Sequence, residues 1–275
     1  MYKLIACDVD GTLLDDSFVT TKADRDAIAK AQEKGIIFSI CSGRSYKSLK
    51  IIAEELGIKA KGNYIIGFNG GVVYDTENER AVKKENLNKD AGMKAVEIFK
   101  RIPRNVEIVI YADAENVLYE EGAEYAPVYR EISKCDWKST DDIIQAAKNL
   151  DSMAKIIFLG ENADLVAFEK ELSGNIGDEA YALFTTEYMM EVTPATSTKA
   201  NGVKWLCEKF GIDISEVICI GDNYNDLSMI KQAGLGVAVA NAVDAAKEIA
   251  DYITENDCSN GAVAEVINKF VLQSH

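Results

Sequence analysis

Two aspartates stand at the end of an apolar run near the start of the chain. Residues 4–9 predict a buried strand, and Asp8 and Asp10, two positions apart, point to the same face of it. Converging carboxylates repel each other unless a cation or a shared proton compensates them, and clustered oxygen ligands suit Mg²⁺. Gly11 and Thr12 fit a turn whose backbone N–H groups face an anion. The alternative is an ordinary Asp-Gly turn with a surface acid.

A hydroxyl, a flexible backbone N–H and a cation follow the next predicted strand. Residues 36–41 form this strand, and Ser42, Gly43 and Arg44 come directly after it. In open α/β sheets ligands bind at the carboxyl ends of the strands, so these groups are predicted to lie near Asp8. Alone, the pattern also fits a turn and a helix cap.

Two more carboxylates and two amides follow a strand in the second half of the chain. The run Gly-Asp-Asn-Tyr-Asn-Asp comes after the strand predicted at 217–220. It puts Asp222 at the strand end, within reach of the same edge, and Asn225 and Asp226 near the start of a helix. For Asp226 the alternative is a helix cap at the positive end of the helix dipole.

Lys199 stands at the start of another predicted helix, where a cation opposes the helix dipole. A solvated Lys is the alternative on local grounds. Four carboxylates, a hydroxyl, an amide and this Lys nevertheless map to one sheet edge, and metal-assisted phosphoryl transfer needs such a set. The single histidine is His275, the last residue. A Ser-His-Asp triad and a His-ligated zinc site are therefore excluded, and acid–base work falls to carboxylates or Lys.

The elements that position these residues alternate between strand and helix. Apolar runs and helical periodicity in the first part of the chain predict strands at 4–9, 36–41 and 64–68 and helices at 21–34 and 46–56. The last part predicts helices at 202–210, 226–232 and 261–270 and strands at 217–220, 235–240 and 252–253. This rhythm indicates an α/β fold with a doubly wound parallel sheet.

The middle of the chain has a different pattern. It predicts helices at 89–101, 141–150 and 163–172, a hairpin of 106–112 with 117–120, and strands at 155–159, 180–185 and 189–192. We interpret residues 85–194 as an α+β domain inserted into a core of residues 1–84 and 195–275. Tyr181, Phe184 and Tyr188 are interpreted as core residues of the insertion, with the lining of a substrate pocket as the alternative.

The composition limits the partners and the compartment. The formal net charge is −15, which disfavours nonspecific binding to nucleic acid and to anionic membranes. No uncharged apolar run is long enough to span a bilayer. The six cysteines are dispersed and include no C-x-x-C, so a disulfide framework is not expected. We therefore expect a cytoplasmic protein.

These motifs together resemble those of the haloacid dehalogenase-like (HAD) superfamily. The chain looks in particular like the Cof-type phosphatases, which carry an inserted α+β cap on a Rossmann-like core. The four motifs match residues 8–12, residues 42–44, Lys199 and residues 221–226, and Asn69-Gly70 resembles a recurrent turn of the family. Ala200 and Gly71 depart from frequent Gly and Ala residues of the family, which leaves the exact subgroup open.

The resemblance implies a role for each site residue. Asp8 is the nucleophile, which becomes an aspartyl phosphate, and Asp10 is the general acid and base. Mg²⁺ is held by the carboxylates of Asp8 and Asp222 and the backbone carbonyl of Asp10, and Asp226 binds it directly, through water or only supports its ligands. The residues implied in binding the phosphoryl group are Thr12, Ser42, Gly43, Lys199, Asn225 and Arg44, the last of which either assists or faces solvent.

The implied function is that of a magnesium-dependent phosphatase acting on small phosphate monoesters, such as sugar phosphates or phosphoglycolate-like compounds. The cap at 85–194 is expected to close over the site and to select the phosphorylated metabolite. Two alternatives remain. A phosphosugar mutase has the same four motifs, and a receiver-type signalling protein also combines acidic residues with a Lys. The physiological substrate and the oligomeric state are not specified by the sequence.

Overall fold

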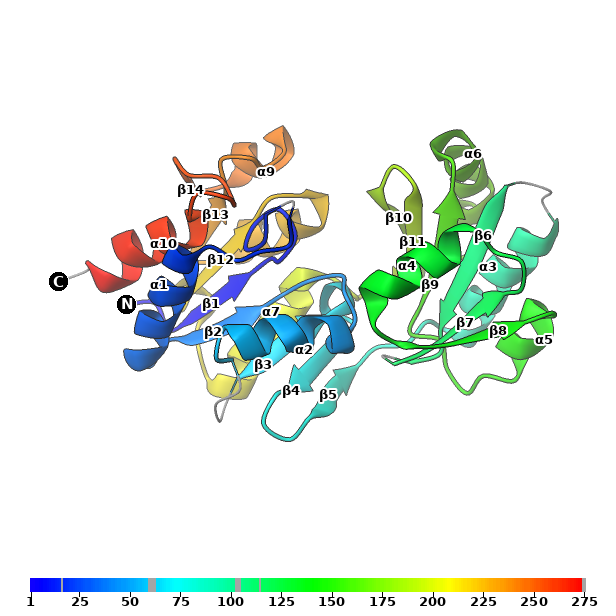
Figure 1. Ribbon diagram of the computed structural model, residues 1–275, viewed down its shortest axis with the longest axis horizontal. Coiled ribbons are helices and arrows are strands. Elements are labelled where there is room, and N and C mark those ends of the chain that lie inside the picture. The colour runs from blue at the N-terminus through cyan, green and yellow to red at the C-terminus, as the bar shows by residue number, and fades with distance from the viewer. Residues whose placement is uncertain (16, 59–62, 102–104, 114, 274–275) are drawn as a thin grey trace. The chain divides into compact units, whose positions relative to one another are not determined.

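The computed structural model describes residues 1–15, 17–58, 63–101, 105–113 and 115–273 (Figure 1). His275 lies outside the described residues. The chain forms two compact units, the first made of residues 1–44, 49–83 and 198–275, and the second of residues 45–48 and 84–197. Residues 84–197 are thus inserted in the sequence of the first unit, and the short segment 45–48 joins them in the second unit.

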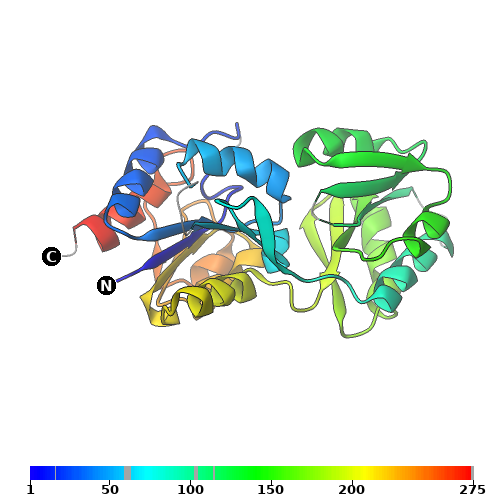
Figure 2. The same ribbon diagram turned by 90° about the horizontal axis from the view of Figure 1, so that it is seen from below.

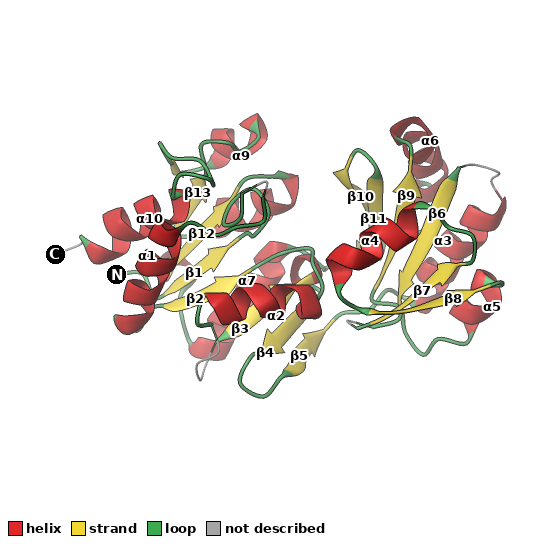
Figure 3. Cartoon of the chain, viewed as in Figure 1, coloured by secondary structure: helices red, strands yellow, loops and turns green. Residues whose placement is uncertain are grey.

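A five-stranded parallel sheet forms the centre of the first unit, in the order β14–β13–β12–β1–β2 (labelled in Figure 1; strands are yellow in Figure 3). Its strands are β1 (Leu4–Cys7), β2 (Ile37–Ile40), β12 (Val217–Gly221), β13 (Leu235–Ala238) and β14 (Tyr252–Ile253). The first strand of the chain lies between β2 and β12, with Cys7 opposite Ile220. All five strands run in the same direction, so their carboxyl ends share one edge.

Helices cover both faces of this sheet. They are α1 (Lys22–Glu33), α2 (Tyr46–Glu55), α7 (Lys199–Phe210), α8 (Leu227–Gln232), α9 (Asp244–Ile249) and α10 (Ala262–Ile267). Leu4 and Ala6 of β1 share an apolar cluster with Val203 of α7. Side chains alternate along a strand, so Ile5 and Cys7 face the opposite side, where α1 and α10 lie (Figure 2). The unit is therefore doubly wound, as the sequence predicted.

A small antiparallel sheet adjoins β2, made of β3 (Tyr64–Gly67), β4 (Val72–Asp75) and β5 (Arg80–Lys84). The sequence predicted β3 as a third strand of the parallel sheet. It pairs instead along its length with β4, and it joins the β2 side through one parallel bridge between Cys41 and Ile66. The cause is the short turn Phe68–Gly70, which reverses the chain directly after β3.

The second unit contains a six-stranded sheet in the order β10–β11–β9–β6–β7–β8. Its strands are β6 (Val106–Tyr111), β7 (Asn116–Glu120), β8 (Asp136–Thr140), β9 (Lys155–Gly160), β10 (Ala180–Thr186) and β11 (Met189–Pro194). Its helices are α3 (Lys89–Arg101), α4 (Tyr125–Ser133), α5 (Ile143–Lys148) and α6 (Asn162–Ser173). Buried residues of α3, α5 and α6 form one apolar cluster with Ile108, Ile156 and Phe158 of the sheet. This mixed α+β architecture agrees with the sequence pattern.

Two elements of the second unit were not predicted. Helix α4 contains Pro127 as its third residue, a first-turn position where the missing N–H makes no intrahelical bond. Its first N–H groups, those of Tyr125 and Ala126, donate instead to the Glu107 carboxylate of β6, at 2.9 Å and 2.8 Å. The other element, β8, is a mostly exposed edge strand that pairs with β7. Its sequence is mostly polar, so no apolar run predicted a strand there.

The interpretation of two cap aromatics as core residues is wrong. Phe184 is 38% exposed and Tyr188 is 49% exposed, because both flank the irregular turn of the β10–β11 hairpin at the edge of the sheet. Tyr181 is half-buried, and its hydroxyl donates to the backbone carbonyl of Ser197 at 3.2 Å. All six cysteines are free thiols. Among the described residues, no helix has both the length and the apolarity needed to cross a bilayer.

Candidate active site

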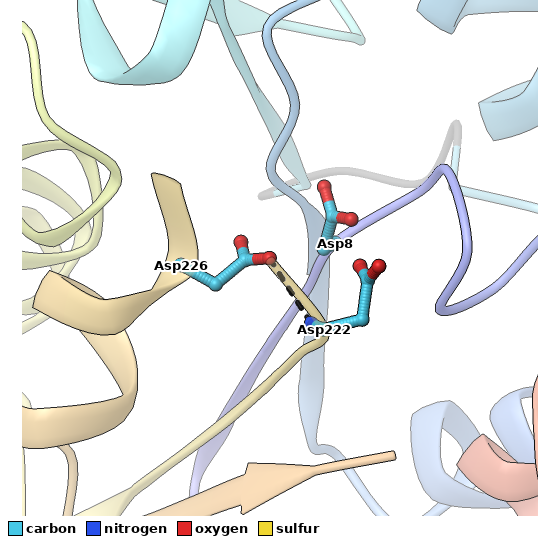
Figure 4. Close-up of side chains that lie close together, drawn as sticks. All are labelled: Asp8, Asp222 and Asp226. Atoms are coloured by element: carbon cyan, nitrogen blue, oxygen red, sulfur yellow. Dashed lines mark hydrogen bonds between the residues drawn. The ribbon is translucent and has the colours of Figure 1, made fainter. Parts of the chain in front are cut away.

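Three carboxylates meet at the carboxyl edge of the parallel sheet. Asp8 follows β1, and its backbone N–H continues the pairing with β12 by donating to Ile220 O at 2.9 Å. Asp222 follows β12, and Asp226 ends the short turn Tyr224–Asp226. One carboxylate oxygen from each aspartate can be chosen so that all three lie within 4.8 Å of one another (Figure 4). The strand positions predicted from sequence therefore bring distant acids together.

Lys199 is the cation of this cluster. It is the first residue of α7, whose N-cap is Thr198, and it is completely buried. Its ammonium group forms ion pairs with Asp8 and with Asp226, the latter at 2.5 Å. These pairs explain why a Lys occupies the unfavourable end of a helix dipole, and they rule out a solvated Lys.

The cluster has more negative charge than Lys199 can compensate. Burial raises the pKa of Asp8, and the neighbouring Asp226 raises it further. Burial and Asp226 likewise raise the pKa of Asp222. For Lys199, burial alone would lower the pKa, but the carboxylates of Asp226 and Asp8 raise it above its ordinary value. Three acids around one ammonium group thus leave an excess of negative charge in a poorly solvated place.

The donor set fits a hard divalent cation. Asp226 is already engaged at both oxygens, because Oδ1 accepts from Lys199 and Oδ2 accepts from the backbone N–H groups of Asp222, at 3.1 Å, and Asn223, at 3.0 Å (Figure 4). Asp8 and Asp222 supply the remaining carboxylate oxygens of the cluster. Oxygen donors that gather around uncompensated charge are what Mg²⁺ and Ca²⁺ prefer.

The turn after Asp10 packs directly against Asp222. The buried Thr12 hydroxyl donates to Asp222 Oδ1 at 2.9 Å and fixes the orientation of that carboxylate. Gly11 has φ +78°, and a Cβ at this position would lie 2.7 Å from Asp222 Oδ2. Glycine is therefore required here both by the backbone conformation and by the approach of the carboxylate.

Asp10 and Arg44 form a bidentate ion pair at the rim of the site. Arg44 Nε lies 2.8 Å from Asp10 Oδ2, and a terminal nitrogen of the guanidinium contacts Asp10 Oδ1. The guanidinium also lies over the ring of Phe18, 5.3 Å from the ring centroid. The Asp10 side chain is 47% exposed, whereas that of Arg44 is 18% exposed. Arg44 is thus neither a solvated side chain nor free of other contacts.

The remaining predicted residues surround the same edge. Ser42 is buried, and its Oγ accepts from the backbone N–H of Arg44 at 3.2 Å. Gly43 lies next to the Asn69 amide, and Asn225 donates from Nδ2 to Asn69 Oδ1 at 3.1 Å. The first unit therefore contains all the site residues predicted from sequence.

Two residues near the site escaped the sequence analysis. Phe18 lies in the loop after the first motif, and no sequence pattern indicated that it would lie near the site. Asn241 donates from Nδ2 to Gly11 O at 2.7 Å and accepts from the Cys258 N–H at 3.1 Å. It follows β13, a predicted parallel strand, so its place at a strand end was the available signal.

The chain is similar in sequence to known hydrolases and phosphatases. A family model for haloacid dehalogenase-like hydrolases matches residues 5–267. The 5-amino-6-(5-phospho-D-ribitylamino)uracil phosphatase YcsE of Bacillus subtilis is 30% identical, over 98% of this chain and 96% of its own. A phosphoglycolate phosphatase of Methanobrevibacter smithii is 28% identical, over 98% of each chain.

Solved structures agree as well. The crystal structure of a haloacid dehalogenase-like hydrolase from Bacteroides thetaiotaomicron superposes with a TM-score of 0.87 at 30% identity, over 98% of this chain and 99% of that one. The family model, the relatives and the solved structure therefore all match this chain over nearly its whole length. The chain belongs to the haloacid dehalogenase-like hydrolases, and within them it is a Cof-type phosphatase.

Proposed function

We propose that the protein is a magnesium-dependent phosphatase that hydrolyses small phosphate monoesters through an aspartyl phosphate on Asp8. The observation that carries this proposal is the meeting of Asp8, Asp222 and Asp226 around the buried Lys199. Such a cluster has a nucleophile, a place for a cation and a fixed positive charge at one point. Metal-assisted phosphoryl transfer requires these three parts.

The metal would be held by the carboxylates of Asp8 and Asp222 and by the backbone carbonyl of Asp10. Since Lys199 and two backbone N–H groups already occupy both oxygens of Asp226, we assign Asp226 the part of orienting Lys199 and the loop after Asp222. When bound, Mg²⁺ would neutralise the excess carboxylate charge and the charge of the phosphoryl oxygens.

The protein residues would carry out two displacements. In the first, an Asp8 oxygen attacks phosphorus, the P–O bond to the leaving group breaks, and Asp10 gives its proton to the leaving oxygen. In the second, Asp10 takes a proton from water, the water oxygen attacks phosphorus, and the bond to Asp8 breaks. Inorganic phosphate and free Asp8 are the products.

Donors around Asp8 would hold the phosphoryl oxygens. They are Ser42, the N–H groups of Gly43 and Thr12, the Asn225 amide and Lys199. Arg44 was also predicted among them, and its bidentate pair with Asp10 gives it a further part. We propose that Arg44 keeps the Asp10 side chain at the rim until a substrate competes for the carboxylate or the guanidinium.

The substrate proposed is a small phosphorylated metabolite. Relatives of similar length are named for phosphoglycolate and for a phosphorylated ribitylaminouracil, both of them small monoesters. We propose that residues 85–194 act as the cap that selects among such compounds, while the first unit supplies the chemistry. Release of inorganic phosphate separates this phosphatase from a phosphosugar mutase, which would return the group to its substrate.

The direct test is Asp8→Asn, assayed for phosphate release from p-nitrophenyl phosphate and from sugar phosphates, with Mg²⁺ and with EDTA. We expect no turnover by the variant at either condition, and loss of wild-type turnover in EDTA. The change removes one charge from a repelling buried cluster, so the thermal midpoint should not fall. Asp26→Asn, at an exposed surface ion pair, is the matched control. Substantial turnover by Asp8→Asn would refute the covalent mechanism.

A further inference from the structure

The turn Phe68–Gly70 joins segments that carry the proposed phosphoryl donors. The Asn69 N–H donates to Ser42 O at 3.0 Å, and the Phe68 N–H donates to Arg44 O at 3.2 Å. Gly70 has φ +95°, and a Cβ there would lie 2.0 Å from the carbonyl oxygen of Thr198, the residue before Lys199. The turn is therefore fixed against two of the segments that form the site.

The backbone of this turn is held in an unusual conformation. Phe68 and Asn69 have φ values of +50° and +52°, in the left-handed region that residues with a side chain rarely adopt. Asn is among the residues that tolerate this region best. Such strain persists only where the surrounding structure determines it, and it is common at functional sites.

The side chain of Asn69 contacts two proposed phosphoryl-binding residues. Its Oδ1 accepts from Asn225 Nδ2 at 3.1 Å. Its Nδ2 lies 3.1 Å from the position that a Cβ of Gly43 would take. Asn69 is 2% exposed, and its Nδ2 has no hydrogen-bond partner within the described part of the chain. A buried amide donor without a partner is costly, so a ligand that arrives between Gly43 and Asn225 would satisfy it.

We propose that Asn69 is a further residue of the phosphoryl site. Asn69 Oδ1 accepts a hydrogen bond from the NH₂ group of Asn225 and so fixes the orientation of the Asn225 amide. Asn69 Nδ2 donates a hydrogen bond to an oxygen of the bound phosphoryl group. The inference rests on the proposed phosphatase activity. The anion recognised is a tetrahedral phosphoryl group, and inorganic phosphate is its simplest form.

The test uses Asn69→Gly, because glycine adopts the left-handed backbone conformation and removes the amide alone. We expect its affinity for inorganic phosphate, measured by calorimetry in Mg²⁺, to fall about 10- to 100-fold, the usual scale of a hydrogen bond to a charged group. The KM for p-nitrophenyl phosphate should rise. The matched control is Glu79→Gly, another position with positive φ (+48°), in the exposed β4–β5 turn, where both quantities should be unchanged.

Coupling to Asn225 supplies a readout that a purely structural role would not change. Asn225→Ala should weaken phosphate binding less in the Asn69→Gly background than in the wild type, since contacting residues are non-additive. Full additivity would overturn the orienting role. Asn69→Asp keeps the acceptor and the backbone preference but replaces the donor with a negative charge, so phosphate should bind more weakly than to Asn69→Gly. Wild-type phosphate affinity in Asn69→Asp would overturn the donor role.

The two proposals fail in different ways. If the wild-type enzyme releases no phosphate from any monoester, the proposed function is wrong. If the wild type is active while Asn69→Gly retains the wild-type KM and phosphate affinity, only the assignment of Asn69 is wrong.

Discussion

At the scale of single residues, the site is organised by the coupling of buried charges. Lys199 is paired with both Asp8 and Asp226, and none of the three has appreciable contact with solvent. Removing the ammonium group of Lys199 would leave buried carboxylates uncompensated, which typically costs about 3–5 kcal/mol. The ion pairs of Lys199 therefore hold the proposed nucleophile Asp8 and the N-terminus of α7 together at the edge of the sheet.

Asp10 differs from these residues because its side chain is half-exposed and contacts Arg44 instead of Lys199. We expect Asp10→Asn to lower kcat roughly 10²- to 10⁴-fold for alkyl phosphates, since the amide neither gives the leaving oxygen a proton nor takes one from water. The effect on the first step should be smaller for p-nitrophenyl phosphate, because p-nitrophenolate leaves without a proton. Burst-phase and steady-state kinetics with both substrates measure the two steps.

The control for this variant is Asp15→Asn, a change in the same loop. The Asp15 carboxylate accepts hydrogen bonds from the backbone N–H groups of Ser17 and Val19. Its kinetics should be close to those of the wild type with both substrates. Equal losses for aryl and alkyl phosphates in Asp10→Asn would contradict the assignment of Asp10 as the acid for the leaving group.

At the scale of elements, α1 and α10 are joined by one buried carboxylate. Asp24 of α1 is completely buried, and its Oδ1 accepts from the backbone N–H of Ala264 in the first turn of α10, at 2.6 Å. Thr21, the N-cap of α1, donates to the other oxygen at 2.7 Å. Burial nevertheless raises the pKa of Asp24 above its ordinary value, because these hydrogen bonds compensate the loss of water only in part.

This shift has a definite sign for stability. Because the pKa of Asp24 is higher in the folded chain, the folded state holds the proton more tightly than the unfolded state. The resulting stabilisation is complete below the ordinary carboxyl pKa of about 4, and it is lost as pH rises through the raised pKa. Asp24→Asn keeps an acceptor oxygen but does not ionise. Its free energy of unfolding should therefore increase relative to that of the wild type as pH rises through this window. Urea unfolding of both proteins at a series of pH values measures the difference.

Asp26 on the same helix provides the opposite control. Its hydrogen bond and ion pair with Lys22 lower its pKa, so its contribution is present above the ordinary carboxyl pKa and is lost as pH falls. Asp26→Asn should thus show the reverse slope, reduced by solvent screening at this exposed position. If the free energies of unfolding of Asp24→Asn and the wild type differed by the same amount at every pH, this result would contradict a pKa of Asp24 raised by burial.

The elements also show what the sequence could reveal. Strands β1, β2 and β12 are buried apolar runs that end in polar residues, so their shared carboxyl edge was predicted from pattern alone, whereas their order in the sheet was not predicted. The contacts of Arg44 with Asp10 and Phe18 did not, because they depend on the path of a loop. Asn69 was noticed as part of a turn, but its amide acquires a partner only through the approach of Asn225. Such side-chain contacts across loops have no periodic signal.

At the scale of the whole molecule, the two units have separate apolar cores. The cluster around Leu4, Tyr64 and Leu206 lies within the first unit, and the cluster around Ile108, Phe158 and Leu172 lies within the second. The proposed catalytic residues all belong to the first unit. The two units can therefore vary independently in sequence, and a change in one core need not alter the packing of the other.

This separation predicts the outcome of an exchange. Replacing residues 84–197 with the corresponding segment of the phosphoglycolate phosphatase relative should leave Asp8, Lys199 and Asp222 in place, because the ion pairs of Lys199 and the hydrogen bond that orients Asp222 form between residues of the first unit. We expect hydrolysis of p-nitrophenyl phosphate to persist while preference among phosphorylated metabolites shifts toward that of the donor. A phosphate-release screen of the wild type, the chimera and the donor measures this shift, with Asp8→Asn in the chimera as the blank. A chimera that hydrolyses p-nitrophenyl phosphate but keeps the wild-type order of preference would show that the inserted unit does not select the substrate.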